Sequence, residues 1–402
     1  MLKIADRINR IKPSPSSMAG QYARELKAAG KDIVGLISGE PDFDTPQTIK
    51  QAAANALAEG KTKYTDVAGT LELRTAIAAK FKRENQLDYA ANEIIVSTGG
   101  KQVIFNALMC TVQAGDEVLI PAPYWVSYPD ITLLAEGTPK FVPCHAENAF
   151  KLRAEDLEAS ITERTRWLIL NAPNNPSGAL YTEQEMRALT DVLLRHPQVW
   201  VMTDDIYEHI VYDQHRFVTP AQVEPQLKDR TLTINGVSKA YAMTGWRIGY
   251  AGGPAALIKA MVKLQSQSTS NPSTPAQAGA LEALTGPQDF PRESRIQYQV
   301  RRDYVVERLN AITGIQCHCP EGAFYVFPRC SDLFGAQTPA GKVIANSDDF
   351  VIYLLEEVGL AVLQGSAYGV DEHFRISFAT SMQTLREGCD RLEVACSRLK
   401  LG

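Results

Sequence analysis

The sequence predicts an α/β protein built on a mainly parallel β-sheet between layers of helices. Short apolar runs rich in β-branched residues recur through the middle of the chain, and stretches with helical periodicity separate most of them. Strand, helix and strand at this spacing favour a parallel sheet that is covered on both faces. The length of 402 residues exceeds the size at which a single core stops growing, so two domains are expected.

The expected strands of this sheet are seven apolar runs, at residues 93–97, 117–120, 140–143, 167–171, 199–203, 231–235 and 248–252. Helical periodicity is clearest at residues 103–112, 155–161 and 182–195. Ligands of such sheets bind beyond the carboxyl ends of the strands. We therefore expect the chemistry of this protein in the loops that follow these runs.

After about residue 257 the pattern changes to a long helical region. Asn-Pro and Gly-Pro pairs at 271–272 and 286–287 break it, and a long charged helix is expected at 292–310. The remaining expected elements are strands at 323–327 and 374–378 and helices at 348–358 and 383–399. They predict a separate α+β layer. Residues 331–347 are rich in Gly, Ala, Pro and polar residues and predict a mobile loop.

Composition excludes several classes of function. The net charge is −5 and no basic stripe suggests a nucleic-acid partner. No apolar run approaches the ~18 residues that span a bilayer. The first residues carry an acid at Asp6 and no apolar core of signal-peptide length, so we expect a cytoplasmic protein. Seven cysteines without a framework predict free thiols. No second pair at a zinc spacing accompanies Cys317-His318-Cys319, so no metal site is expected.

Two of the strand-end loops are rich in glycine or asparagine. Gly99-Gly100-Lys101 follows the run at 93–97 and opens a helix, where backbone N–H groups and the helix dipole favour an anion. Taken alone, this motif is equally well a tight turn between a strand and a helix. The loop at 171–178 contains Asn175, which offers a neutral donor for a phenolate or a carboxylate.

Two further loops carry charged groups. Asp204-Asp205 and Tyr207 follow the run at 199–203; one acid could simply cap a helix, but together they suggest a charge partner and a hydroxyl aimed into one pocket. Lys239 follows the run at 231–235, although burying an unpaired ammonium is expensive. A desolvated lysine has a lowered pKa and can form a Schiff base with an aldehyde cofactor.

Arg375 lies inside the short apolar run at 374–378. It is either paired within the core or kept for bidentate binding of a carboxylate, and we favour the carboxylate.

Five motifs in this order resemble the class I/II aminotransferases, which are pyridoxal-phosphate enzymes of fold type I. They are GGKQ, PNNPSG, DDIY, SKAYAMTGWRIGY and HFRISF, and the likeness extends from about Gly39 to Arg375. The early segments IKPSPS, GEPDFDTP, KYTDVAGTLELR and PAPYWVSYP look most like the bacterial aspartate aminotransferases, which include prephenate-active members. Leu363-Gln364-Gly365 departs from the Val-Pro-Gly of many relatives.

The resemblance implies an α/β fold in which a large domain, residues 45–290, holds the seven-stranded sheet between helices. A smaller α+β domain would come from both chain ends, residues 1–44 and 291–402. The implied reaction is transamination with pyridoxal 5′-phosphate, in a homodimer with shared active sites. The substrates would be aspartate, glutamate or prephenate with 2-oxoglutarate.

The resemblance also implies a role for each matching residue. The catalytic residues would be Lys239, which holds the cofactor and moves the Cα proton, Asp204, which pairs with the pyridine nitrogen, and Tyr207, which with Asn175 bonds the phenolate oxygen. The phosphate would be surrounded by Gly100, Lys101, Ser238, Arg247 and Tyr64 of the neighbouring subunit. Trp125 would stack on the ring and border the substrate. The substrate α-carboxylate would be clamped by Arg375, Asn175 and the backbone of Gly39, and a distal carboxylate would meet Lys12 and Lys101.

Two alternatives stay open at this point. The same fold can carry other chemistry, such as carbon–sulfur elimination or decarboxylation, or transamination of aromatic amino acids or alanine. A regulatory protein with an aminotransferase-like domain would need an added DNA-binding module. The likeness begins within the first ~40 residues, so we do not expect such a module.

Overall fold

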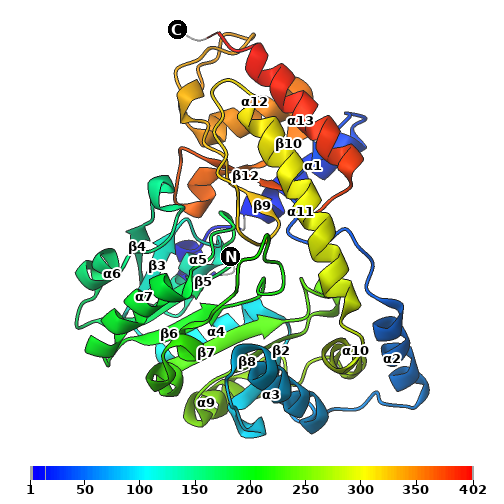
Figure 1. Ribbon diagram of the computed structural model, residues 1–402, viewed down its shortest axis with the longest axis vertical. Coiled ribbons are helices and arrows are strands. Elements are labelled where there is room, and N and C mark those ends of the chain that lie inside the picture. The colour runs from blue at the N-terminus through cyan, green and yellow to red at the C-terminus, as the bar shows by residue number, and fades with distance from the viewer. Residues whose placement is uncertain (1–2, 14, 401–402) are drawn as a thin grey trace.

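The computed structural model describes residues 3–13 and 15–400, which form a larger and a smaller lobe (Figure 1). The larger lobe contains a seven-stranded sheet in the order β2-β8-β7-β6-β5-β3-β4. Its strands are β2 (Ile94–Ser97), β3 (Glu117–Ala122), β4 (Thr138–Pro143), β5 (Thr165–Asn171), β6 (Trp200–Asp204), β7 (Thr231–Gly236) and β8 (Gly249–Gly252). In this sheet β8 runs opposite to the other six strands, which are parallel to one another. The predicted fold class, an α/β protein with a mainly parallel sheet, is confirmed.

Helices cover both faces of the sheet, which explains why its strands are almost continuously apolar. In β5, Trp167 and Ile169 pack with α4 (Gly100–Thr111), α5 (Ser127–Leu134) and α9 (Ala255–Ser266). Leu168 and Leu170 point to the other face, toward α6 (Ala154–Ser160) and α7 (Glu183–Arg195). The β2 end of the sheet packs with α2 (Gln47–Ala58), α3 (Leu71–Asn85) and α10 (Thr274–Thr285). The short α8 (Pro220–Val223) precedes β7.

The smaller lobe combines elements from near both ends of the chain, with α1 in the same lobe as α12 and α13 (Figure 1). Its elements are α1 (Pro15–Ala28), β1 (Val34–Gly35), α11 (Asp289–Asn310), β9 (Tyr325–Val326), α12 (Ser347–Val358), β10 (Leu360–Ala361), β11 (Leu363–Gln364), β12 (Phe374–Ser377) and α13 (Met382–Ser397). β1 pairs with β10, and β12 pairs with β9 and β11. We propose that the two domains have the predicted borders, with residues 45–290 as the large domain.

Residues 331–347 differ from the mobile loop that their composition predicts. The side chains of Leu333, Ala336 and Ile344 are buried in the core of the smaller lobe. The backbone N–H of Gln337 donates to the carbonyl oxygen of Lys400 at 3.0 Å, so the segment is tied to the end of the described chain. Apolar residues spaced among the glycines and prolines are the reason for this packing.

No helix among the described residues combines the length and the apolar character that crossing a membrane requires.

Candidate active site

A cavity of about 300 Å³ lies at the carboxyl ends of β5, β6 and β7, where the two lobes meet. Parallel sheets bind their ligands at this edge because the strand-end loops converge there. The sequence-predicted residues that line the cavity are Gly39, Gly100, Lys101, Trp125, Asn175, Asp204, Tyr207, Ser238, Lys239, Arg247 and Arg375. Five separate segments of the large lobe and two of the small lobe therefore meet at one place.

Lys239 is half-buried in the wall of the cavity. Its Nζ donates a hydrogen bond to the carbonyl oxygen of Gly39. Burial lowers the pKa of Lys239 to about 8, and the charges of Arg247 and Arg375 act in the same direction against that of Glu40. Because only a neutral amine can attack a carbonyl or accept a proton, this lysine is prepared for chemistry near neutral pH.

Asp204 ends β6 with its side chain buried in the cavity wall. The hydroxyl of Tyr128 donates to its Oδ2 at 2.7 Å, and Asn171 Nδ2 donates to its carbonyl oxygen at 2.7 Å. Burial raises the pKa of Asp204 to about 6, although the Tyr128 hydrogen bond and the charge of Lys239 act to lower it. The carboxylate is therefore ionised at pH 7 and above, facing the cavity.

Of the two adjacent acids, Asp204 lines the cavity together with Tyr207, and Asp205 does not. Successive side chains of an extended segment alternate between the two faces of the sheet. Asp205 does not line the cavity; it is buried and accepts a hydrogen bond from the hydroxyl of Thr203. Burial raises the pKa of Asp205 to about 8. Only Asp204 can therefore act as a charge partner within the site.

Arg375 is 3% exposed and has no carboxylate at ion-pair distance among residues 3–13 and 15–400. Its Nη1 donates to Asn175 Oδ1 at 3.0 Å, and its Nη2 donates to the Ile37 carbonyl oxygen at 2.8 Å. The guanidinium lies 4.3 Å from the ring centre of Tyr325. A buried cation held only by neutral groups lacks a counter-charge, which an anionic ligand would supply. This geometry favours carboxylate binding over pairing within the core.

Tyr207 and Tyr325 join the two lobes beneath the cavity. Their hydroxyls share a hydrogen bond of 2.8 Å, and both side chains are buried. Because Tyr325 also lies against Arg375, the three residues form one connected wall.

The opposite side of the cavity is suited to an anion. Gly100 begins α4, so the unpaired backbone N–H groups of its first turn face this region. The preceding Gly99 has φ +88°, and a Cβ there would collide with the guanidinium of Arg247. Arg247 and Lys101 are exposed, and burial together with the charge of Arg247 lowers the pKa of Lys101. Two cations beside a helix N-terminus match a dianion.

Sequence reasoning did not name eight residues that line the cavity, Ile104, Val126, Ser127, Tyr128, Asn171, Ile206, Thr244 and Tyr325. Tyr128 follows Trp125 by three residues, and their rings pack edge to face with centres 5.3 Å apart. That helical spacing is a signal that could have identified Tyr128.

Two predicted residues, Lys12 and Tyr64, do not line the cavity within one chain. Lys12 is exposed and lines a neighbouring cavity of about 490 Å³ that Lys101 and Arg247 share. Tyr64 is 91% exposed and lies at a separate surface hollow. The roles of these two residues stay predictions.

Comparisons with known proteins agree with this geometry. A family model described as aminotransferase class I and II matches residues 31–392. A probable aspartate/prephenate aminotransferase of Rhizobium leguminosarum bv. phaseoli is 58% identical over 400 residues, covering 100% of both chains. An aspartate/prephenate aminotransferase of Cereibacter sphaeroides is 55% identical, covering 99% of this chain and 100% of the relative.

Solved structures of similar chains superpose closely. The aspartate aminotransferase of Rhizobium meliloti has a TM-score of 0.97 and 55% identity, with 100% of both chains covered. That of Thermus thermophilus with maleate has a TM-score of 0.91 and 41% identity, covering 98% of this chain and 100% of the other.

Proposed function

The chain belongs to the class I and II aminotransferases, and on this premise we propose that it transfers the amino group of aspartate to 2-oxoglutarate with pyridoxal 5′-phosphate as cofactor. The observation that carries the proposal is the meeting of Lys239, Asp204 and Arg375 in one cavity. These three side chains provide a weakly basic amine, a buried carboxylate and an uncompensated buried cation. An amino acid carries an α-carboxylate, which matches the Arg375 cation, and an amine, which would react with the cofactor in place of the Lys239 amine.

The residues of the cavity fit the proposed cofactor. Asp204 would face the ring nitrogen, and Trp125 would cover one face of the ring. Asn175 Oδ1 is already bonded to Arg375, which leaves the amide N–H free to donate to the phenolate oxygen, as Tyr207 would also do. The phosphate would be held by Gly100, Lys101, Ser238, Arg247 and Tyr64 of the partner subunit. Gly249 supports this fit, because a Cβ there would collide with the Gly99–Gly100 backbone at the start of α4. The absence of a side chain at Gly249 therefore lets the start of α4 pack where the phosphate would be held.

The reaction requires a base, an orienting group and a fixed negative charge. When bound, pyridoxal phosphate supplies an electron sink for the charge left at the substrate Cα. Lys239, as a neutral amine, would remove the Cα proton and deliver it to the cofactor carbon on the other side of the substrate nitrogen. Arg375 and Asn175 hold the α-carboxylate, so the Cα–H bond rather than another bond points at Lys239. Asp204, ionised above its pKa of about 6, keeps a facing ring nitrogen protonated.

Aspartate is proposed as the amino donor because the relatives named above carry it in their names. Lys12 and Lys101 are cations that line a neighbouring cavity, which Arg375 does not line, and a distal carboxylate would extend toward them. Glutamate and prephenate have such a carboxylate too, so both belong in the substrate panel.

The experiment combines absorption with a substrate panel. The purified protein should be yellow, and it should transfer amino groups from aspartate faster than from alanine or tyrosine to 2-oxoglutarate, oxaloacetate or prephenate. Cystathionine should release no pyruvate and ammonia. A colourless protein that stays inactive with added pyridoxal phosphate would contradict the proposal, and lyase activity would favour the alternative chemistry of this fold.

A homodimer is part of the proposal. Leu57 and Tyr64 are exposed beside a surface hollow lined by residues 269–275, an arrangement that a second copy of the chain would bury. Sedimentation of the purified chain should give twice the mass of 44.2 kDa. A cytoplasmic location is also proposed, supported by seven cysteines that form no disulfide.

A further inference from the structure

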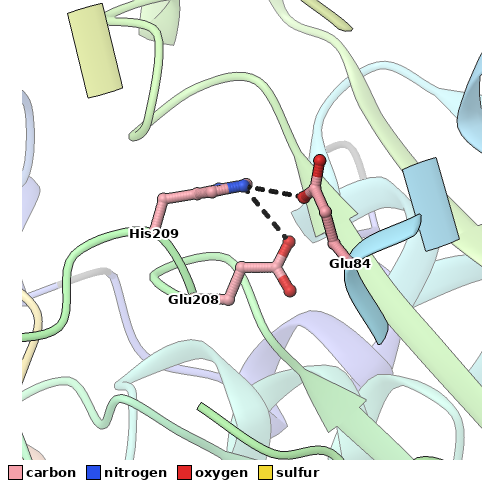
Figure 2. Close-up of side chains that lie close together, drawn as sticks. All are labelled: Glu84, Glu208 and His209. Atoms are coloured by element: carbon pink, nitrogen blue, oxygen red, sulfur yellow. Dashed lines mark hydrogen bonds and ion pairs between the residues drawn. The ribbon is translucent and has the colours of Figure 1, made fainter. Parts of the chain in front are cut away.

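A buried network of charged and amide groups lies directly behind Tyr207. Its centre is Glu208, whose side chain is 4% exposed, and Lys80 on α3, whose side chain is fully buried. Lys80 Nζ donates to Glu208 Oε1 and, at 2.8 Å, to Asn85 Oδ1. Figure 2 shows the carboxylates of Glu84 and Glu208 both facing the Nε2 atom of His209, which bonds Glu84 Oε2 at 2.9 Å.

This network already contains its own cation. Glu84, Glu208 and His209 place ligand atoms within 4.8 Å of one another, as in a metal site. The ammonium of Lys80, however, is bonded to Glu208 and lies 3.5 Å from Glu84 Oε2. Because Lys80 neutralises these carboxylates, the cluster carries no argument for a metal ion.

Hydrogen bonds from side-chain amides connect Glu208 to the proposed cofactor-binding segments. Its Oε2 accepts from Asn85 Nδ2 at 2.7 Å, and its Oε1 accepts from Asn235 Nδ2 at 2.7 Å. Asn235 lies at the end of β7, four residues before Lys239. Glu208 itself directly follows Tyr207 in the chain. One carboxylate therefore links α3, the loop after β6 and the end of β7.

From these contacts we propose that Glu208 is a positioning residue, which fixes the loop carrying Asp204 and Tyr207 against the segment that leads into Lys239. The inference rests on the proposed function, since it concerns the placement of groups around the cofactor. Asp204 and Lys239 reach the same ligand from adjacent strands. A change in the separation of these strand ends alters how both groups meet that ligand at once.

Glu84 provides a matched control within the same network. Like Glu208 it contacts Lys80 and His209, but no hydrogen bond joins it to Asn235 or to the loop after β6 apart from its bond to His209. Glu84→Gln therefore removes a carboxylate from Lys80 and keeps the link between the two cofactor-binding segments.

The test compares Glu208→Gln with Glu84→Gln. The readouts are the dissociation constant of pyridoxal phosphate from the apoprotein, the pH midpoint of the absorption band of the holoprotein, and kcat and KM for aspartate. We expect Glu208→Gln to weaken cofactor binding by about 10-fold or more, to shift the midpoint and to lower kcat more than it raises KM. Glu84→Gln should keep the dissociation constant, kcat and KM within about twofold of the wild type and should leave the pH midpoint unchanged.

A second variant keeps the test decisive where Glu208→Gln fails to fold because Lys80 is left uncompensated. Asn235→Ser shortens the side chain that reaches Glu208 and leaves the ion pair with Lys80 intact, so it should reproduce the cofactor effects. Wild-type cofactor affinity and absorption midpoint in both variants, with only a lower melting temperature of the apoprotein, would overturn the inference alone. A wild-type chain that forms no lysine-linked absorption band would overturn the proposed function itself.

Discussion

The two sides of the active-site cavity are built in contrasting ways. The inner wall consists of Asn175, Asp204, Tyr207 and Arg375, which are all buried and held by hydrogen bonds to fixed partners. The outer rim consists of Lys12, Lys101 and Arg247, which are all exposed. Groups held by packing keep one geometry, whereas exposed side chains on flexible stems adapt. The inner wall should therefore determine the reaction. The outer rim should hold the cofactor phosphate through Lys101 and Arg247 and affect the choice among substrates through Lys12 and Lys101.

The largest expected effect comes from removing the inner-wall cation. Arg375→Leu should lower kcat/KM for aspartate about 30-fold or more, because losing one partner of a buried charge pair costs about 2–5 kcal/mol. Steady-state kinetics with aspartate and 2-oxoglutarate measure this. Arg329→Leu is the control, since Arg329 pairs with Asp332 away from the cavity. Similar losses in both variants would show that Arg375 has no special role at the inner wall.

A second prediction concerns what the inner wall costs the folded state. The folded-state pKa of Asp204, about 6, lies above its ordinary value of 3.8, so ionisation opposes folding. Above pH 6, ionisation of Asp204 lowers the free energy of unfolding by about 3 kcal/mol. Below pH 4 the carboxyl group is protonated in both states and this cost disappears. Asp204→Asn should therefore stabilise the apoprotein at pH 8, with roughly half of the gain left at pH 5.

Urea unfolding of the apoprotein at the two pH values measures this difference. Asp130→Asn at the rim is the control and should change the free energy of unfolding by less than about 0.5 kcal/mol. An Asp204→Asn apoprotein that is less stable than the wild type at pH 8 contradicts the burial cost assigned to this wall.

A smaller effect is expected one contact further from the cavity. Tyr128→Phe removes the hydroxyl that donates to Asp204 Oδ2 at 2.7 Å and leaves the ring against Trp125. A hydrogen bond to a charged group contributes about 1.5–3 kcal/mol, so kcat should fall about 10-fold or more. The pH below which kcat declines should also rise, because the bond acts to lower the pKa of Asp204. An unchanged pH profile would mean that Tyr128 only fills space.

The smallest effect is expected at the rim. Lys12→Ala should raise KM for aspartate a few-fold, since an exposed charge pair contributes about 0–1 kcal/mol, and should leave kcat for alanine unchanged. Substrate-panel kinetics measure both. Equal effects on aspartate and alanine would remove Lys12 from distal carboxylate recognition, and a loss as large as that of Arg375→Leu would erase the contrast between wall and rim.

The sequence predicted the sheet and most of the inner wall, because Asp204 ends an apolar strand, Asn175 and Tyr207 lie in the loops that follow such strands, and Arg375 interrupts a short apolar run. Reasoning from the residues alone left open which of the two acids faces the cavity, and the alternation of side chains in an extended segment separates Asp205 from Asp204. It missed the bond between Tyr128 and Asp204, which are 76 residues apart, since no local pattern records such a contact. Lys80 reads as a solvated helix residue, and only tertiary packing shows that it is buried.

The positions of Lys12 and Tyr64 were the least predictable part of the site for a related reason. Tyr64 and Lys12 do not reach the cavity within one chain, so their proposed roles depend on a second subunit or on the arrangement of the exposed N-terminal segment. Local sequence patterns carry no information on either.

The most direct test of the account is to find the lysine that carries the cofactor. Treatment of the yellow holoprotein with sodium borohydride, followed by proteolysis and mass spectrometry, should place the mass of reduced pyridoxal phosphate on Lys239. Lys239→Ala treated in the same way should show no such modification. Cofactor mass on Lys101 or another lysine of the wild-type protein, or on none, would contradict the central claim.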